Sequence, residues 1–325
     1  MARNAHARGF VLIVVISMIM AMTVLVLGLM HRSRQALRVS DAVLRAAQAL
    51  ACAQSTLQTG LEVIARVEDP SLDNQVRDFI GRAHHFAFDY GHGTLTLSDE
   101  SGKFNVNRLI GGADKPDRQR IDQMLALIDV LNRQSATPAL GYGLVPALID
   151  WTDKDSETTH LEFIAQENRG AESDVYNSAT TLAGCANRPL SHPADLYLLH
   201  NVSREAVDRL LPFVTAWGSG LININSAPAQ VLEALTEDLD TTLAELIVEQ
   251  RQRRPFEDLQ ELERVPGMSV TILQKLQPSI CFAAEKPTFR IEAVGQVGGL
   301  KRTVLAWAKK NDTTQTVDVI HYQEL

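Results

Sequence analysis

Apolar residues form one unbroken run near the N-terminus, from Phe10 to Met30, and no charged side chain interrupts it. A helix rises about 1.5 Å per residue, so this run spans about 30 Å, the thickness of a bilayer core. The leader before it, residues 1–9, carries Arg3 and Arg8. Because basic residues stay on the cytoplasmic side, the pattern predicts one membrane-spanning helix with the rest of the chain across the membrane.

The start of this run resembles the leader of a type IV prepilin. A secretory signal has a shorter apolar core, followed by a small-residue cleavage site. Here the small residue precedes the run, at Gly9-Phe10, and no such site follows it. A dedicated peptidase cuts prepilins after this glycine and leaves the apolar helix on the mature protein. We therefore expect cleavage between Gly9 and Phe10, with an uncleaved single-pass anchor as the alternative.

Helical spacing of apolar residues continues beyond the run. The apolar positions are Ala36, Leu37, Val39, Val43, Leu44, Ala47, Leu50, Ala51 and Leu57, with charged and polar residues between them. The first proline is Pro70. The pattern predicts one long helix that ends near Arg66, and its amphipathic second half needs a surface to cover, most simply a sheet.

Two hairpin patterns lie on either side of the middle of the chain. Residues 85–90 and 94–97 alternate around a glycine-containing turn, and residues 103–107 alternate like a third strand. Near the C-terminus, residues 289–293 and 303–308 alternate around a Gly-Gly turn. These patterns predict antiparallel strands.

Between the hairpins, from about Leu109 to about Ile280, the spacing is helical. The expected helices cover residues 121–131, 145–151, 193–199, 203–214, 230–235, 241–251, 257–264 and 270–276, and a polar loop covers residues 153–188. Ser203 and Ser226 are the expected N-caps of two of them, and residues 221–225 are a short strand. A helical block inserted into a sheet domain of the α+β class explains this order.

The net charge of -8 argues against a nucleic-acid-binding surface, because phosphate binding needs clustered Lys and Arg. The cysteines are Cys52, Cys185 and Cys281, which excludes a four-cysteine zinc site. In an oxidising compartment one disulfide can form, and we consider a bond between Cys185 and Cys281 that joins the helical block to the sheet, with free thiols as the alternative. Cys52 is expected to be a small buried thiol of the long helix.

Five segments, taken in order, resemble the general secretion pathway protein K (GspK) family. They are Gly9-Phe10, Glu100-Ser-Gly-Lys-Phe-Asn-Val-Asn107, Leu148-Ile-Asp-Trp-Thr-Asp-Lys-Asp155, Gly170-Ala-Glu172 and Ile222-Asn-Ile-Asn-Ser-Ala-Pro-Ala-Gln-Val-Leu232. The family comprises minor pseudopilins of type II secretion. The resemblance covers nearly the whole chain.

The resemblance implies a pilin-like long helix on a small antiparallel sheet, with a large inserted helical domain that contains a helix-hairpin-helix-like segment. The implied parts are a prepilin leader (1–9), a transmembrane segment (10–30), the pilin-like helix and first strands (31–108), the inserted domain (109–280) and C-terminal strands that complete the sheet (281–325). It also implies a structural protein of the inner membrane and periplasm. That protein is cut by prepilin peptidase, methylated at the amine of Phe10, and caps the pseudopilus tip with the I and J minor pseudopilins.

One position separates this chain from most pilins. If Phe10 becomes the first mature residue, Val14 is the fifth. Most pilins carry a glutamate at this position, and its carboxylate meets the terminal amine of the next subunit. A buried carboxylate without that amine is costly in a membrane. An apolar residue is therefore what the resemblance implies for a subunit with no neighbour above it, while an ordinary apolar anchor residue is the alternative.

Acidic residues gather in the middle of the chain. They are Asp150, Asp153, Asp155, Glu157, Glu172 and Asp174. Calcium takes six to eight oxygen ligands, and a loop can present them, although the glycine of an EF-hand is absent. The resemblance implies calcium in the inserted domain, which these carboxylates fit; a solvated acidic loop is the alternative.

Residues 226–276 also resemble tandem helix-hairpin-helix modules of membrane-tethered DNA-uptake proteins, which makes DNA binding the alternative function. The first hairpin, residues 236–240, holds three acids and no glycine, and acids also surround Arg251, Arg253 and Arg254. We therefore expect a structural motif that binds no nucleic acid. Enzyme motifs such as H-E-x-x-H and G-x-S-x-G are absent, so no catalysis is expected.

Overall fold

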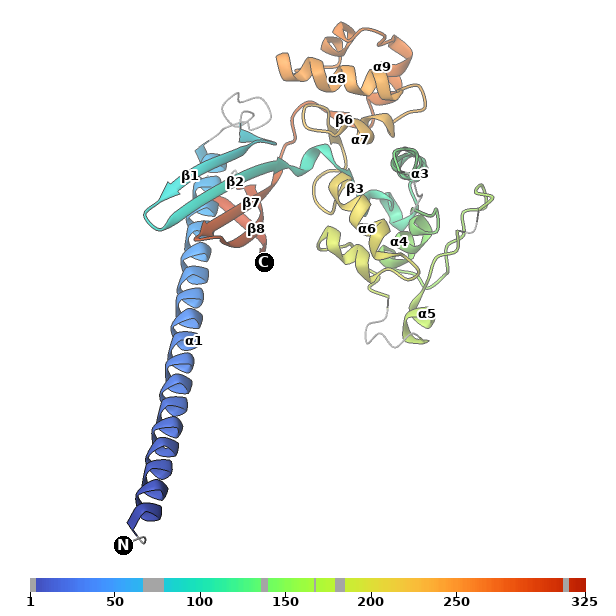
Figure 1. Cartoon of the computed structure of the whole chain (residues 1–325). Coiled ribbons are helices and arrows are strands. Elements are labelled where there is room, and N and C mark those ends of the chain that lie inside the picture. The colour runs from blue at the N-terminus through green and yellow to red at the C-terminus, as the bar shows by residue number, and fades with distance from the viewer. Residues whose placement is uncertain (1–3, 67–78, 136–139, 167, 179–184, 312–315) are drawn as a thin grey trace.

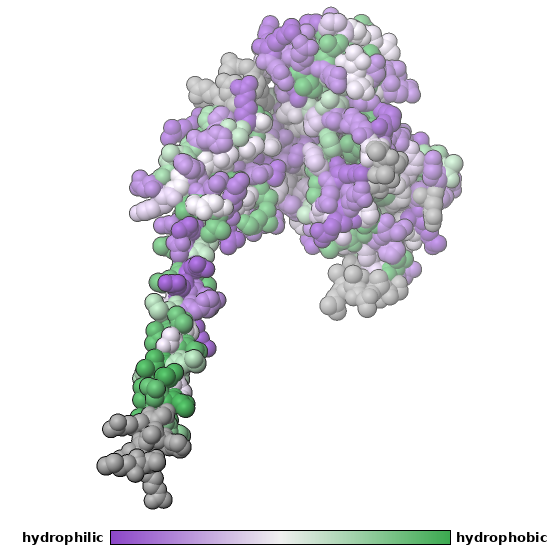
Figure 2. Space-filling view, in the orientation of Figure 1, coloured by the Kyte–Doolittle hydropathy of each residue, from purple (hydrophilic) through white to green (hydrophobic). Residues whose placement is uncertain are grey.

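The N-terminal helix α1 (Asn4–Arg66) dominates the shape of the molecule. The computed structural model describes residues 4–66, 79–135, 140–166, 168–178, 185–311 and 316–325. The first half of α1 projects from the body as a bare rod (Figure 1). The large apolar side chains from Phe10 to Met30 are all exposed on this rod, and Figure 2 shows them as its hydrophobic part. Within the described residues, α1 is the one helix long and apolar enough to cross a membrane.

The last third of α1, from about residue 46, packs on a five-stranded antiparallel sheet. The order of the strands is β1 (Ala83–Phe88), β2 (Gly91–Asp99), β7 (Thr288–Val297), β8 (Leu300–Lys310) and β9 (Val317–Glu324). Ala53, Leu57 and Ile64 of α1 are buried against apolar side chains of β2, β7 and β8. The small core between helix and sheet explains the amphipathic spacing of this part of α1.

A glycine sets the close approach of helix and sheet. A Cβ atom on Gly295 of β7 would lie 1.9 Å from the carbonyl oxygen of Ala49 in α1. Since no real Cβ comes so near a backbone atom, the helix reaches this position only over a glycine.

A helical domain, here called the insert, lies between β2 and β7 and has its own core. Its helices are η1 (Glu100–Gly102), η2 (Val106–Arg108), η3 (Gly112–Asp114), α3 (Arg118–Arg133), α4 (Leu144–Thr152), α5 (Ser173–Ser178), η4 (Pro193–Leu198), α6 (Arg204–Leu210), η5 (Leu211–Phe213), α7 (Ala229–Glu233), α8 (Thr241–Arg253), η6 (Gln260–Arg264) and α9 (Val270–Leu276). Two short parallel pairs join distant parts of it: β3 (Phe104–Asn105) with β4 (Val214–Thr215), and β5 (Ile222–Asn223) with β6 (Ile280–Cys281).

Most of the predicted elements are confirmed. The long helix ends at Arg66, both hairpins form, and Ser203 caps α6 by accepting a hydrogen bond from the Ala206 amide. Strand β9 is an addition: it pairs with the outer edge of β8, and its side chains alternate too little between apolar and polar to signal a strand.

Two local predictions are wrong. Residues 103–107 were expected in the pilin-like sheet, but β3 pairs with β4, because Phe104 and Val106 pack into the core of the insert. The insert therefore begins near Glu100. Ser226 was expected to cap a helix, but the N-cap of α7 is Pro228, and the Ser226 hydroxyl donates to the Asn223 carbonyl instead.

Candidate metal centre and assembly surface

Three elements of the insert bring the predicted acidic residues together. Asp150 lies in the last turn of α4, and Asp153 is the C-cap of that helix, its amide donating to the Ile149 carbonyl. Asp155 follows in the loop, and Glu172 lies directly before α5. One carboxylate oxygen each from Asp153, Asp155 and Glu172 lie within 4.8 Å of one another. We call these three residues the carboxylate cluster.

Several of the carboxylate oxygens are buried without a hydrogen-bond partner. Among the described residues, these are Asp150 Oδ2, Asp153 Oδ1 and both oxygens of Glu172. Asp150 is fully buried, and its other oxygen accepts the Thr159 amide at 2.9 Å. A buried carboxylate without a donor is costly, so this arrangement requires either a proton or a cation.

Electrostatic repulsion between the carboxylates also favours binding of a proton or a cation. Burial, together with the neighbouring carboxylates of Asp155, Asp150, Glu172 and Asp114, raises the pKa of Asp153 to about 7. Burial also raises the pKa of Asp150 and of Glu172. Lys154 does not neutralise the cluster, because its exposed ammonium pairs with Asp114 at 3.4 Å. The all-oxygen donor set fits a hard cation such as calcium.

The six predicted acids do not contribute equally. Asp153, Asp155 and Glu172 form the cluster, with Asp150 beside it. Glu157 and Asp174 are exposed and lie outside the group of close carboxylate oxygens. Asp114 was missed: it ends η3 with a positive φ of 59° and acts on Asp153 from another part of the chain, which no local spacing could indicate.

Cys185 and Cys281, the two thiols considered for a disulfide, are both free in this structure, as is Cys52. The Cys185 thiol donates to the carbonyl of Asp150 at 3.1 Å, while Cys281 lies in β6. Burial raises the pKa of each of these two thiols to about 11. Cys52 is buried on α1, as predicted.

An asparagine near the start of the insert ties together distant parts of its backbone. The Asn105 side chain donates to the carbonyls of Trp217 and Gly218, each at 3.0 Å. Gly102 packs so tightly on the turn after β5 that a Cβ atom would lie 2.4 Å from the carbonyl carbon of Ser226. These contacts therefore fix the start of the insert against the segments around β4 and β5 of the same domain.

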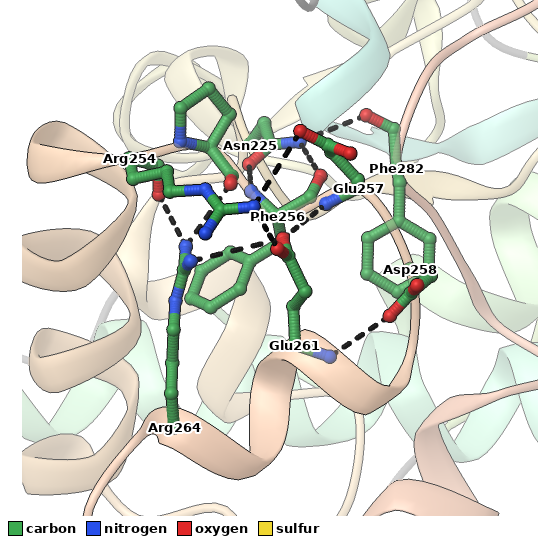
Figure 3. A network of polar contacts seen from close by, with 9 residues as sticks. Asn225, Arg254, Phe256, Glu257, Asp258, Glu261, Arg264 and Phe282 are labelled. Carbon is green, nitrogen blue, oxygen red and sulfur yellow. Dashed lines mark hydrogen bonds and ion pairs between the residues drawn. The ribbon is translucent and has the colours of Figure 1, made fainter.

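The arginines of the helix-hairpin-helix-like segment are engaged within the protein (Figure 3). Arg254 pairs with Glu261, and Arg264 donates to the carbonyl of Pro255 at 3.1 Å. Arg251 is half-buried and donates to the Ile224 and Ala227 carbonyls.

Arg253 pairs with Glu249 on the same helix. Because phosphate contacts need free guanidinium groups, this segment supports the fold, and the alternative of DNA binding gains no support.

An apolar surface remains bare on α1 between the membrane run and the sheet. Val39 and Val43 are exposed on one side of the helix, while Leu37, 68% exposed, and Leu44, 57% exposed, lie on the other side. Ala51, which continues the same side of the helix, is also exposed. Large apolar side chains exposed on both sides of a water-facing helix indicate surfaces that other proteins cover.

Comparison with known proteins gives a consistent result. Two family models described as "Type II secretion system (T2SS), protein K" match residues 102–219 and 222–280. The type II secretion system protein K of Pseudomonas aeruginosa is 30% identical over 259 residues, which is 77% of this chain and 74% of that protein. The protein of the same name from Klebsiella pneumoniae is 24% identical over 224 residues, 68% of this chain and 66% of that protein.

The fold is also similar to a solved structure. The match is to a chain in the crystal structure of the GspK–GspI–GspJ complex of the type 2 secretion system from enterotoxigenic Escherichia coli. The TM-score is 0.60 at 20% identity, and the match covers 90% of this chain and 99% of that chain. The long helix, the antiparallel sheet and the helical domain are therefore an architecture already seen in nature.

Proposed function

The chain belongs to the protein K family of the type II secretion system, and we propose from this premise that it forms the tip of the periplasmic pseudopilus. It is a minor pseudopilin, a structural component of the secretion machinery with a single membrane anchor. In our proposal the anchor lies in the inner membrane, the sheet and the insert lie in the periplasm, and the protein promotes assembly of the filament without catalysing a reaction.

The bare apolar surface on α1 is the observation that carries this proposal. Burial of apolar area contributes about 25 cal/mol per Å², so Leu37, Leu44 and their neighbours favour packing against other helices. The relative of known structure is part of a complex with GspI and GspJ. We propose the I and J minor pseudopilins of the same system as the partners that cover this surface.

The size and position of the insert support the role as the terminal subunit. Figure 1 shows α8 and α9 of the insert farther from the N-terminus than the sheet. A further subunit stacked on this end would meet the insert. Val14 agrees with this, because a subunit without a neighbour above it has no terminal amine to pair with a carboxylate.

We propose that the carboxylate cluster, with Asp150 beside it, holds calcium. Asp153, Asp155 and Glu172 would supply the ligand oxygens, and Glu157 and Asp174 lie outside this group of close carboxylate oxygens. A bound cation would neutralise the repulsion among these carboxylates. It would also tie the end of α4 to the start of α5, so its role is to stabilise the insert.

Co-purification tests the proposed assembly. The full chain, expressed with the I and J pseudopilins of its own system, is expected to purify with both from detergent-solubilised membranes. Leu44→Glu should weaken this complex at least tenfold, because it would bury an unpaired charge at the helix contact. Leu198→Glu is the matched control, since Leu198 is 58% exposed and lies on the insert. Equal recovery of both variants would contradict the proposed contact.

A further inference from the structure

Four aromatic rings join the insert to the sheet. His192 and Trp217 come from the insert, and Trp307 of β8 and His321 of β9 come from the sheet. The ring centroids of His192 and Trp307 lie 4.5 Å apart with the rings nearly perpendicular, and those of His192 and His321 lie 4.3 Å apart. We call these four residues the bridging cluster. His192 and Trp307 each contact all three other rings, and His192 is the titratable one of the two.

His192 is also the N-cap of η4. Its Nδ1 accepts a hydrogen bond from the Ala194 amide at 2.9 Å, and its own amide donates to Asp195 Oδ2 at 3.1 Å. An imidazole nitrogen that accepts a hydrogen bond carries no proton, so this contact assigns the ring hydrogen to Nε2. Nε2 is buried and has no hydrogen-bond partner among the described residues.

The charged groups around His192 oppose a positive ring. His321 of β9 and Arg290 of β7 disfavour a second positive charge, and Asp195 of η4 favours it. Arg290 itself lies over the Trp307 ring and pairs with Glu292 at 2.9 Å. Burial, with a smaller contribution from His321, lowers the pKa of His192 to about 4.

We propose that His192 makes the junction between insert and sheet a proton-sensitive latch. A proton from solvent can bind only at Nδ1, because Nε2 already carries one. Once protonated, Nδ1 can no longer accept the hydrogen bond from the Ala194 amide, so η4 loses its N-cap. The protonated ring also places a positive charge beside His321 and Arg290. The junction is therefore closed while His192 is neutral and opens when it is charged.

The direction of the pH effect on the closed junction follows from the pKa of His192 in its two states. In an open junction His192 has an ordinary pKa near 6.5, and in the closed junction that pKa is about 4. The stability that His192 contributes to the closed state is present above pH 6.5 and is lost as the pH falls toward 4. Each unit in this window shifts the equilibrium toward the open state by up to about tenfold.

Opening need not unfold either part, because the insert and the helix–sheet unit have separate cores. Asp153 cannot produce the same response. Its pKa is raised, so acid relieves the repulsion around it and stabilises the insert.

Hydrogen exchange of the full chain in detergent micelles tests the latch. Between pH 6.5 and 5, we expect the protection of η4 and β9 to fall by at least tenfold after correction for the intrinsic exchange rates. The second half of α1 should keep its protection. No loss at η4 and β9 down to pH 5 would overturn the proposal.

Cap-preserving variants provide the controls. His192→Asn and His192→Ser keep an oxygen that can accept the Ala194 amide but cannot titrate, so their protection at pH 5 should equal that at pH 7.5. An acid response in both variants equal to that of the natural chain would show that other groups open the junction, and the proposal would fail. His321→Asn should make the opening smaller, because His192 then loses a repelling neighbour.

Discussion

At the scale of single residues, the carboxylate cluster gives the sharpest prediction. Calcium that binds only the folded chain stabilises it by about 2.7 kcal/mol at a hundredfold excess over the Kd. Asp153→Asn should remove this gain, because Asp153 is a central member of the cluster. Asp174→Asn should keep it, because Asp174 is exposed and outside the cluster. Thermal unfolding of the full chain in micelles, with calcium and with chelator, provides the measurement. An unchanged melting temperature after chelation would show a plain acidic loop.

The same cluster predicts how the effect of chelator depends on pH. Asp153 has an ordinary pKa of 3.8, and in the folded chain it is about 7. A raised pKa means that the metal-free folded state gains stability from protonation, and this gain is lost as the pH rises through about 7. Chelator should therefore lower the melting temperature more at pH 8 than at pH 5. A larger effect at pH 5 would contradict this origin.

A third residue-scale prediction concerns the leader. We expect the mature protein to begin at Phe10 with a methylated amine, because Gly9 directly precedes the apolar run. Mass spectrometry of the N-terminal peptide from the membrane-bound protein checks this. A chain that keeps Met1, or one cut after the apolar run, would not fit a prepilin leader.

At the scale of elements, the packing of α1 on the sheet depends on Gly295. Gly295→Ala would push a methyl group against the Ala49 carbonyl, so the free energy of unfolding should fall by about 1–3 kcal/mol. Gly141→Ala is the control, because a Cβ there would meet nothing within 4 Å, and it should change stability by less than about 0.5 kcal/mol. Chemical unfolding followed by circular dichroism compares the two variants. Equal stability would show that helix and sheet do not approach as closely as described.

The elements that the sequence predicted well are those that carry their own periodic signal. Helices α1, α3 and α9 have sustained helical spacing, and their observed ends agree closely with the prediction. Strand β9 has no such signal, because an edge strand with mostly exposed side chains does not alternate. Strand β3 was assigned to the wrong sheet, since its pairing with β4 joins segments far apart in the chain.

In the candidate site too, the sequence predicted neighbours along the chain but not contacts between distant segments. Asp150, Asp153, Asp155 and Glu172 lie close enough in sequence to be found as a group. Asp114 comes near Asp153 only through the fold. Whether Cys185 pairs with Cys281 could not be predicted for the same reason, because cysteine count says which bonds are allowed and not which thiols meet.

At the scale of the whole molecule, the insert is a separable unit. It leaves the sheet after β2 and returns at β7, where Asp99 and Phe289 are paired neighbours. Replacing residues 101–287 by a two-residue Asn-Gly turn should therefore leave a folded helix–sheet unit. Its melting should be insensitive to chelator, because the carboxylate cluster is gone. Hydrogen exchange across β2 and β7 checks the fold, and loss of protection in both strands would show that the sheet needs the insert.

The uninterrupted length of α1 has a mechanical consequence. No proline breaks the helix between the membrane run and the sheet, so it forms one rod of 63 residues, about 95 Å long. Because the helix is unbroken, a movement of the membrane-spanning part along the helix axis moves the sheet and the insert by the same distance. Each residue of the anchor drawn out of the bilayer would raise the sheet and the insert by about 1.5 Å. The height of the tip above the membrane would then be a direct gauge of how far the filament beneath it has grown.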